Sequence, residues 1–178
     1  MDEFNFLEVP FPDSYWVVPG LFLAGEYPGS RSESDARKRI QELLKTGLRA
    51  FFDLTRPGEL EPYEAMLQEE ADWLGLVVEY HQISIQEFGV ANTPEITHTL
   101  DAIEAAMTRD MPVYLHCHAG IGRTGLLVGC YLARHGFTGQ VALEHLTQLR
   151  RSVPGSEWTR SPESDEQVEV VLYWKQDQ

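Results

Sequence analysis

Two side chains with complementary chemistry, Cys117 and Arg123, lie six positions apart in the segment VYLHCHAGIGRTG, residues 113–125. An ionised thiol is a strong nucleophile, and the planar guanidinium of arginine binds two phosphate oxygens at once. Together the two groups suit nucleophilic attack on a bound phosphoryl group. Thr124 follows the arginine, and its hydroxyl would stabilise the sulfur as it leaves a phosphoenzyme.

The residues around this pair predict a loop that binds an anion. A short buried strand is predicted to end at His116, and a helix is predicted from Thr124 to His135. A glycine-containing loop between a strand and a helix directs backbone N–H groups and the positive end of the helix dipole at an anion. The same groups favour the ionised form of Cys117. We therefore expect a phosphate cradle made of His118, Ala119, Gly120, Ile121, Gly122 and Arg123.

Two histidines, His116 and His118, flank the cysteine. We expect His116 to hydrogen-bond nearby backbone and steady the loop, and His118 to lie at the rim of the pocket. A metal site is disfavoured because successive residues of a strand, such as His116 and Cys117, point to opposite faces. No metal is expected.

The rest of the chain alternates short β-rich runs with helical patterns. This order predicts an α/β fold, with a central, mainly parallel, twisted sheet flanked by helices in a three-layer domain over residues 1–178. The four tryptophans are expected to pack in or against the core, and Val141, Leu146 and Leu149 to form the apolar stripe of one late helix. The expected elements are a hairpin over 15–24, strands within 48–54, 76–85 and 112–116, and helices over 35–46, 62–74, 94–107, 124–135, 138–151 and 165–175.

Composition narrows the classes of function. The formal net charge of −14 argues against general binding to nucleic acid or to anionic membranes, which both favour basic surfaces. No apolar run is long enough to span a bilayer, and the acidic start MDEFNFLEVPFPDSYW lacks the pattern of a secretory signal. We therefore expect a cytoplasmic monomer, in which Cys117 and Cys130 stay reduced.

The loop HCHAGIGRTG resembles the signature loop of the protein tyrosine phosphatase superfamily. The flanks SYWVVPGLFLAGEYPG and RRSVPGSEWTRSPESDEQVEVVLYW are similar to the entry strands and the C-terminal helix pair of its small, bacterial-type members. The resemblance implies a two-step reaction, in which Cys117 forms a cysteinyl-phosphate that water then hydrolyses. It implies no metal and no cofactor.

The resemblance also implies a carboxylic acid on a loop before the cysteine, usually an aspartate. At that position, in ISIQEFGVANTPEI, this chain has Glu87, and no aspartate lies between Asp72 and Asp101. Glu87 is therefore the candidate general acid. Glu95, Asp53 or no acid at all are the alternatives, and for Asp53 a turn carboxylate that caps local N–H groups is favoured.

Two further residues keep alternative interpretations. In the family pattern Gln167 is a candidate for a position near the pocket. Cys130 is expected to pack in the core, with a redox partnership with Cys117 as the alternative.

These observations favour a phosphatase acting on phosphorylated protein. A compact domain implies a shallow pocket that accepts phosphotyrosine and also phosphoserine or phosphothreonine. A non-catalytic phosphate-binding module, a phosphoinositide phosphatase and a rhodanese-like sulfur transferase are the alternatives. The first stays open because Glu87 replaces an aspartate, whereas the cradle lacks the lysines that lipid phosphatases often carry.

Overall fold

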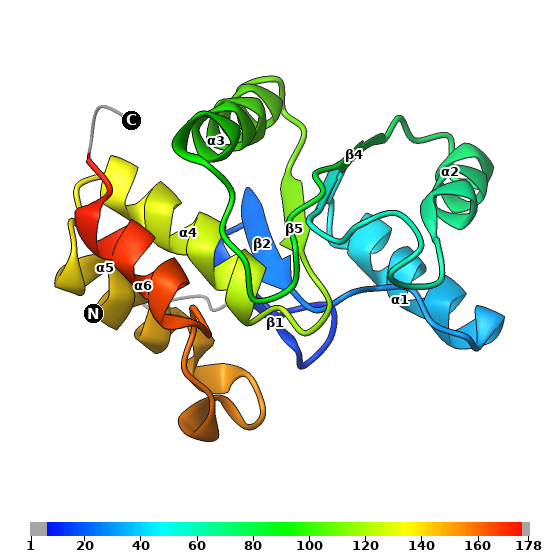
Figure 1. Ribbon diagram of the computed structural model, residues 1–178. Coiled ribbons are helices and arrows are strands. Elements are labelled where there is room, and N and C mark those ends of the chain that lie inside the picture. The colour runs from blue at the N-terminus through cyan, green and yellow to red at the C-terminus, as the bar shows by residue number, and fades with distance from the viewer. Residues whose placement is uncertain (1–6, 176–178) are drawn as a thin grey trace, which may run out of the picture.

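The computed structural model describes residues 7–175, which contain a five-stranded sheet with the strand order β1-β2-β5-β3-β4 (Figure 1). Residues 1–6, the start of the acidic N-terminal stretch, lie outside the described residues. The hairpin strands β1 and β2 pair antiparallel, and all other neighbours pair in parallel. The strands are β1 (Ser14–Val18), β2 (Phe22–Gly25), β3 (Ala50–Asp53), β4 (Glu79–Gln82) and β5 (Val113–His116).

Helices cover both faces of this sheet, so the domain has three layers (Figure 1). In β3, Phe51 packs with the first two helices and Phe52 packs with the later ones, as the twofold alternation of a strand requires. The two faces of the sheet therefore carry two separate apolar cores. The helices are α1 (Glu33–Lys45), α2 (Glu64–Trp73), α3 (Thr93–Thr108), α4 (Gly122–Arg134), α5 (Gln140–Leu149) and α6 (Asp165–Tyr173), with 3₁₀ turns η1 (Arg150–Ser152) and η2 (Ser156–Trp158).

The strand register brings the carboxyl ends of the three central strands to one edge. Gly25 of β2 and Asp53 of β3 both lie opposite His116, the last residue of β5. In open α/β sheets, ligand sites form at this edge, where the loops after adjacent strands meet. The sheet thus places the loops after β2, β3 and β5 around one point.

Local sequence signals set the boundaries of several helices. Ser32 caps α1 through a bond from the Asp35 N–H, and Asn92 and Glu95 form a reciprocal capping box at the start of α3. Ser164 and Gln167 form a second capping box, which starts α6. These caps explain why the predicted helices lie close to the observed ones.

The expected α/β fold is confirmed, but some predicted core positions are wrong. Trp73 and Trp158 have exposed fractions of 81% and 86%, because each lies at the end of a helical segment that turns it away from the sheet. Val141 is 55% exposed, whereas Ala142 and Leu146 are buried. Residues four apart, such as Ala142 and Leu146, share one face of a helix, but Val141 lies five residues before Leu146.

No helix among residues 7–175 combines the length and the apolar character that crossing a bilayer requires.

Candidate active site

The loop after β5 forms the expected turn between a strand and a helix. Cys117 directly follows the strand and is 3% exposed, and α4 begins at Gly122, two residues before the predicted start. His118 and Ala119 are exposed, whereas Gly120 is buried. The loop therefore opens to solvent at its rim and places Cys117 at its base.

Close backbone contacts fix the shape of this loop. Gly120 has φ +68°, and a Cβ there would lie 2.5 Å from the carbonyl group of Gly25. The Tyr27 N–H donates to the His118 carbonyl at 2.8 Å, and the Ser161 hydroxyl donates to the Ile121 carbonyl at 2.7 Å. Glycine at position 120 is thus required both by its backbone angle and by the neighbouring strand.

His116 anchors the base of the loop from inside the protein. Its Nδ1 lies 3.3 Å from the Cys117 carbonyl, which only accepts, and its Nε2 lies 2.7 Å from the Tyr63 hydroxyl. Complete burial lowers the pKa of His116, so the neutral ring donates through Nδ1 and accepts the Tyr63 proton at Nε2. The predicted contact with nearby backbone is present, and Tyr63 is a partner that the sequence did not indicate.

Arg123 is 3% exposed and binds a carboxylate from the loop after β3. Its two terminal nitrogens donate to both oxygens of Glu59, at 2.9 and 2.6 Å, and one of them also donates to the Ile85 carbonyl at 3.1 Å. These bonds lower the pKa of Glu59. Sequence reasoning missed Glu59, because it lies on the loop after β3 and only the parallel pairing of β3 with β5 brings it near.

Glu87 lies on the exposed loop between β4 and α3 and interacts electrostatically with Arg123. The alternative acids are engaged elsewhere. Asp53 is 1% exposed and accepts from the Thr55 backbone and from the Tyr80 hydroxyl, as a turn carboxylate would. Glu95 caps α3. Of these candidates, only Glu87 has an exposed carboxylate beside the loop.

Gln167 lies beside the phosphate loop and is completely buried. Its Nε2 donates to the Gly89 carbonyl at 3.0 Å, and its Oε1 accepts from the backbone of Glu163 and Ser164. Both polar atoms lie within 3.4 Å of the position that a Cβ on Gly122 would occupy. Gln167 thereby connects α6 to the loop of Glu87 and to the start of α4.

The other two predicted residues occupy contrasting environments. The Thr124 hydroxyl is buried and has no hydrogen-bond partner among the described residues. Cys130 is a free thiol in the core of α4, where burial raises its pKa and keeps it neutral. Packing therefore accounts for Cys130.

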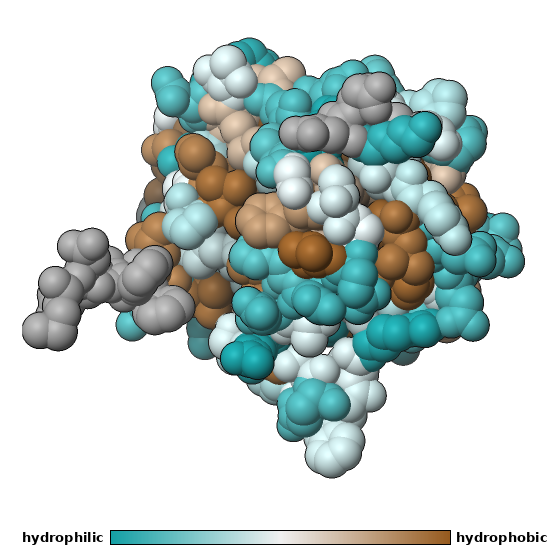
Figure 2. Space-filling model, turned by 90° about the vertical axis from the view of Figure 1, so that its left-hand side faces the viewer, coloured by the Kyte–Doolittle hydropathy of each residue, from teal (hydrophilic) through white to brown (hydrophobic). Residues whose placement is uncertain are grey.

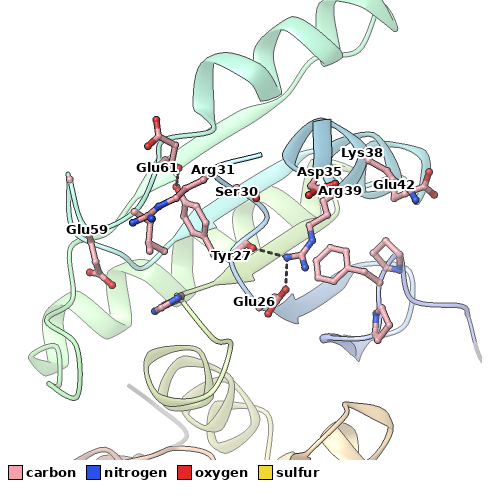
Figure 3. Close-up of a pocket in the computed structure, with 17 residues that line it drawn as sticks. Glu26, Tyr27, Ser30, Arg31, Asp35, Lys38, Arg39, Glu42, Glu59 and Glu61 are labelled. Carbon is pink, nitrogen blue, oxygen red and sulfur yellow. Dashed lines mark hydrogen bonds and ion pairs between the residues drawn. The ribbon is translucent and has the colours of Figure 1, made fainter. Parts of the chain in front are cut away.

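A groove of about 970 Å³ leads away from the loop, and it shares Glu59 and His118 with the site. Figure 3 shows Glu59 at one end and the α1 side chains Asp35 and Lys38 at the other. The carboxylates that line the groove outnumber its lysine and arginine side chains, five to three. A substrate that extends beyond its phosphate would meet a surface with mixed charge and an excess of acid.

The side of the molecule that carries α5 and α6 has no such hollow in view. Figure 2 shows hydrophobic residues there interrupted by hydrophilic ones. Within residues 7–175, no group of three or more His, Cys, Asp or Glu side chains is placed to hold a metal ion.

The mostly parallel sheet, together with a strand–loop–helix unit that carries Cys117 and Arg123, defines the protein tyrosine phosphatase class of domains. Residues 12–167 match the family model described as "PTP-SAK: Swiss Army Knife protein, DSP-PTPase phosphatase domain". This chain belongs to that family of dual-specificity-type phosphatase domains.

Curated relatives agree with this assignment. Protein tyrosine phosphatase domain-containing protein 1 of Mus musculus is 30% identical over 154 residues, which cover 83% of this chain and 20% of the mouse protein. The dual specificity protein phosphatase CDC14B of Mus musculus is 28% identical across 88% of this chain and 31% of its own length. The chain thus spans only a fifth to a third of the length of these two relatives.

Solved structures share the fold. Tk-PTP in its active form superimposes with a TM-score of 0.71 and 20% identity, covering 94% of this chain and 99% of its own. PTPMT1 in complex with PI(5)P has a TM-score of 0.67 and 16% identity, covering 91% and 94%. The PP-IP phosphatase SIW14 of S. cerevisiae has a TM-score of 0.65 and 18% identity, covering 95% and 89%.

Proposed function

We propose that this chain hydrolyses phosphate monoesters on proteins, with Cys117 as the nucleophile and Arg123 as the phosphate ligand. The observation that carries the proposal is the position of Cys117 in a glycine-shaped loop just before the N-terminus of α4, with Arg123 interacting electrostatically with it. Backbone N–H groups of residues 118–123 bind the phosphoryl oxygens, and these groups and the helix dipole stabilise the charge that develops in the transition state.

The reaction proceeds in two displacements. The Cys117 thiolate forms an S–P bond while the P–O bond to the leaving group breaks, and Glu87 donates its proton to the departing oxygen. The Glu87 carboxylate then takes a proton from water, which attacks phosphorus and breaks the S–P bond. Inorganic phosphate and the thiolate result. The unpartnered Thr124 hydroxyl is free to donate to the departing sulfur.

The groove supports a protein substrate over a phosphoinositide, although solved neighbours include a phosphatase bound to PI(5)P and a PP-IP phosphatase. A ligand with several phosphates needs several unpaired cations near the first phosphate. Of the three cations that line the groove, Arg39 is paired with Glu26 and with the Tyr27 carbonyl, and five carboxylates outnumber the three cations. Phosphotyrosine and phosphoserine or phosphothreonine peptides are the substrates that we favour.

A direct assay tests this proposal. Purified protein is expected to release phosphate from phosphotyrosine peptides and to be inhibited by vanadate. Cys117→Ser is expected to abolish turnover and retain peptide binding. Full turnover by Cys117→Ser would remove the proposed nucleophile. Faster release from phosphoinositides than from every peptide would favour the lipid alternative, and binding without turnover by the wild type would favour a non-catalytic module. The cytoplasmic location and the monomeric state stay predictions.

A further inference from the structure

Arg150 is an arginine that the proposed mechanism does not use. It is the first residue of η1 and is 4% exposed. Its terminal nitrogens donate only to the carbonyl and hydroxyl of Thr159, at 3.3 and 3.4 Å, and its Nε has no hydrogen-bond partner among the described residues. Within residues 7–175, no carboxylate forms an ion pair with Arg150. A buried charge without a counter-charge is unfavourable, so an anion close to the Arg150 guanidinium would stabilise the folded protein.

Arg150 interacts across the core with groups near the phosphate loop. η1 packs against β1, and the buried Tyr15 of β1 lies in the same apolar core as Cys117. Arg150 interacts electrostatically with the Tyr15 hydroxyl and with the Cys117 thiol. The Tyr15 hydroxyl is also buried without a hydrogen-bond partner among residues 7–175. Arg150 and Tyr15 therefore both carry unsatisfied polar atoms on the side of the core that also contains Cys117.

Arg123 also interacts electrostatically with Cys117, but it has an acidic partner. Both of its terminal nitrogens bind the Glu59 carboxylate, so the pair is neutral as a unit. Arg123, Arg150, Tyr15 and Tyr114 interact electrostatically with Cys117, and the neutral His116 bonds to its carbonyl. Among these, Arg150 is the cation without an acidic partner.

We propose that Arg150 is a positioning residue that stabilises the ionised Cys117 from the core side of the loop, which leaves Arg123 for the substrate phosphate. This inference rests on the proposed function in taking Cys117 as the nucleophile. The two arginines then have different roles. Arg150 stabilises the negative charge of the Cys117 sulfur in the free protein, and Arg123 binds the phosphoryl oxygens of the substrate.

Alkylation of Cys117 by iodoacetamide tests the proposal without turnover, because the thiolate is the reacting form. The rate is followed against pH by mass spectrometry of the Cys117 peptide in the full chain, with the buried Cys130 as an internal reference. In Arg150→Met the midpoint of the profile is expected to move up by about one pH unit or more. Arg150→Lys keeps the charge and is expected to retain the wild-type midpoint.

Arg151→Met is the matched control, since Arg151 is the exposed neighbour in η1, and it is expected to leave the profile unchanged. A folded Arg150→Met with the wild-type midpoint would overturn the proposal. If Arg150→Met does not fold, Arg150→Gln replaces it, because Gln keeps a polar head for Thr159 but no charge. Equal midpoints for Arg150→Gln and Arg150→Lys would also overturn it. A shifted midpoint in a protein that releases no phosphate would uphold Arg150 and reject the phosphatase function.

Discussion

At the scale of single residues, the proposed acid is the group that the surrounding structure constrains least. Glu87 is exposed on a loop whose next residue, Phe88, has φ +58°, an uncommon angle for a bulky side chain. Glutamate is one methylene longer than the aspartate usual in this superfamily, so its carboxyl group reaches the leaving oxygen from a different backbone position. Its contribution therefore has to be measured by the dependence on the leaving group.

Glu87→Gln is expected to lower kcat for phosphopeptides by about 10²-fold or more, the usual contribution of a general acid. An aryl phosphate with a good leaving group needs no proton in the first step, so its rate is expected to fall much less. Glu95→Gln is the control, because glutamine also completes the capping box of α3. An equal loss on both substrates would reject Glu87 as the acid.

His116 predicts how stability depends on pH. Burial lowers its pKa in the folded protein, so below about pH 6.5 the unfolded chain binds the extra proton and the folded chain does not. The free energy of unfolding should therefore fall as pH drops from about 6.5 toward the folded-state pKa, by at most about 1.4 kcal/mol per pH unit. Urea unfolding at pH 7.5 and 5.5 measures this loss.

The variant His116→Asn removes that titration and is expected to lose less stability over the same interval. His118→Asn, at an exposed histidine of the same loop, is expected to keep the wild-type dependence. If His116→Asn also kept the wild-type pH dependence of the free energy of unfolding, that dependence would come from groups other than His116.

At the scale of elements, α6 is bonded to the loop that carries Glu87, the proposed acid. The buried amide of Gln167 joins Gly89 to the N-terminus of α6 and contacts the start of α4. Gln167→Leu keeps the volume but leaves the Gly89 carbonyl and the Glu163 and Ser164 N–H groups without this partner. Each buried group left unsatisfied costs about 1–3 kcal/mol.

We therefore expect Gln167→Leu to lower the free energy of unfolding and to lower kcat for phosphopeptides more than for an aryl phosphate with a good leaving group. In the double variant with Glu87→Gln, the second effect should disappear, because the acid that the loop positions is gone. Additive losses in kcat would show that Gln167 acts independently of Glu87. Gln140→Leu, on the exposed start of α5, controls for the change of residue type.

Elements and the phosphate loop could be predicted from the sequence because their signals are local. The alternation of strands and helices, the capping residues and the loop of residues 117–123 each lie within a few neighbouring residues. The roles of Glu59 and Tyr63 could not be predicted, because each meets the residues of the loop only through the pairing and packing of distant elements. Trp73 and Trp158 show that residue type alone does not predict burial. Tryptophan usually packs in the core, but the position of each residue on its helical segment leaves it exposed.

At the scale of the whole molecule, the net charge of −14 and the acidic excess of the groove act in the same direction on a substrate. Lysine or arginine beside the phosphorylated residue would be attracted, and acidic flanks repelled, with a strength that falls as salt rises.

Reversing Asp35 and Glu61 to lysine changes the groove charge by four without touching Arg123 or the loop. The double variant is expected to raise KM for peptides with basic flanks several-fold, to lower it for acidic flanks, and to leave a small aryl phosphate unaffected. Steady-state kinetics at low and high salt measures this, with the double variant Glu64→Lys and Asp72→Lys, on α2 and outside the groove lining, as the control with the same change in net charge. An unchanged preference between the two peptide series would mean that the substrate chain leaves the loop by another route.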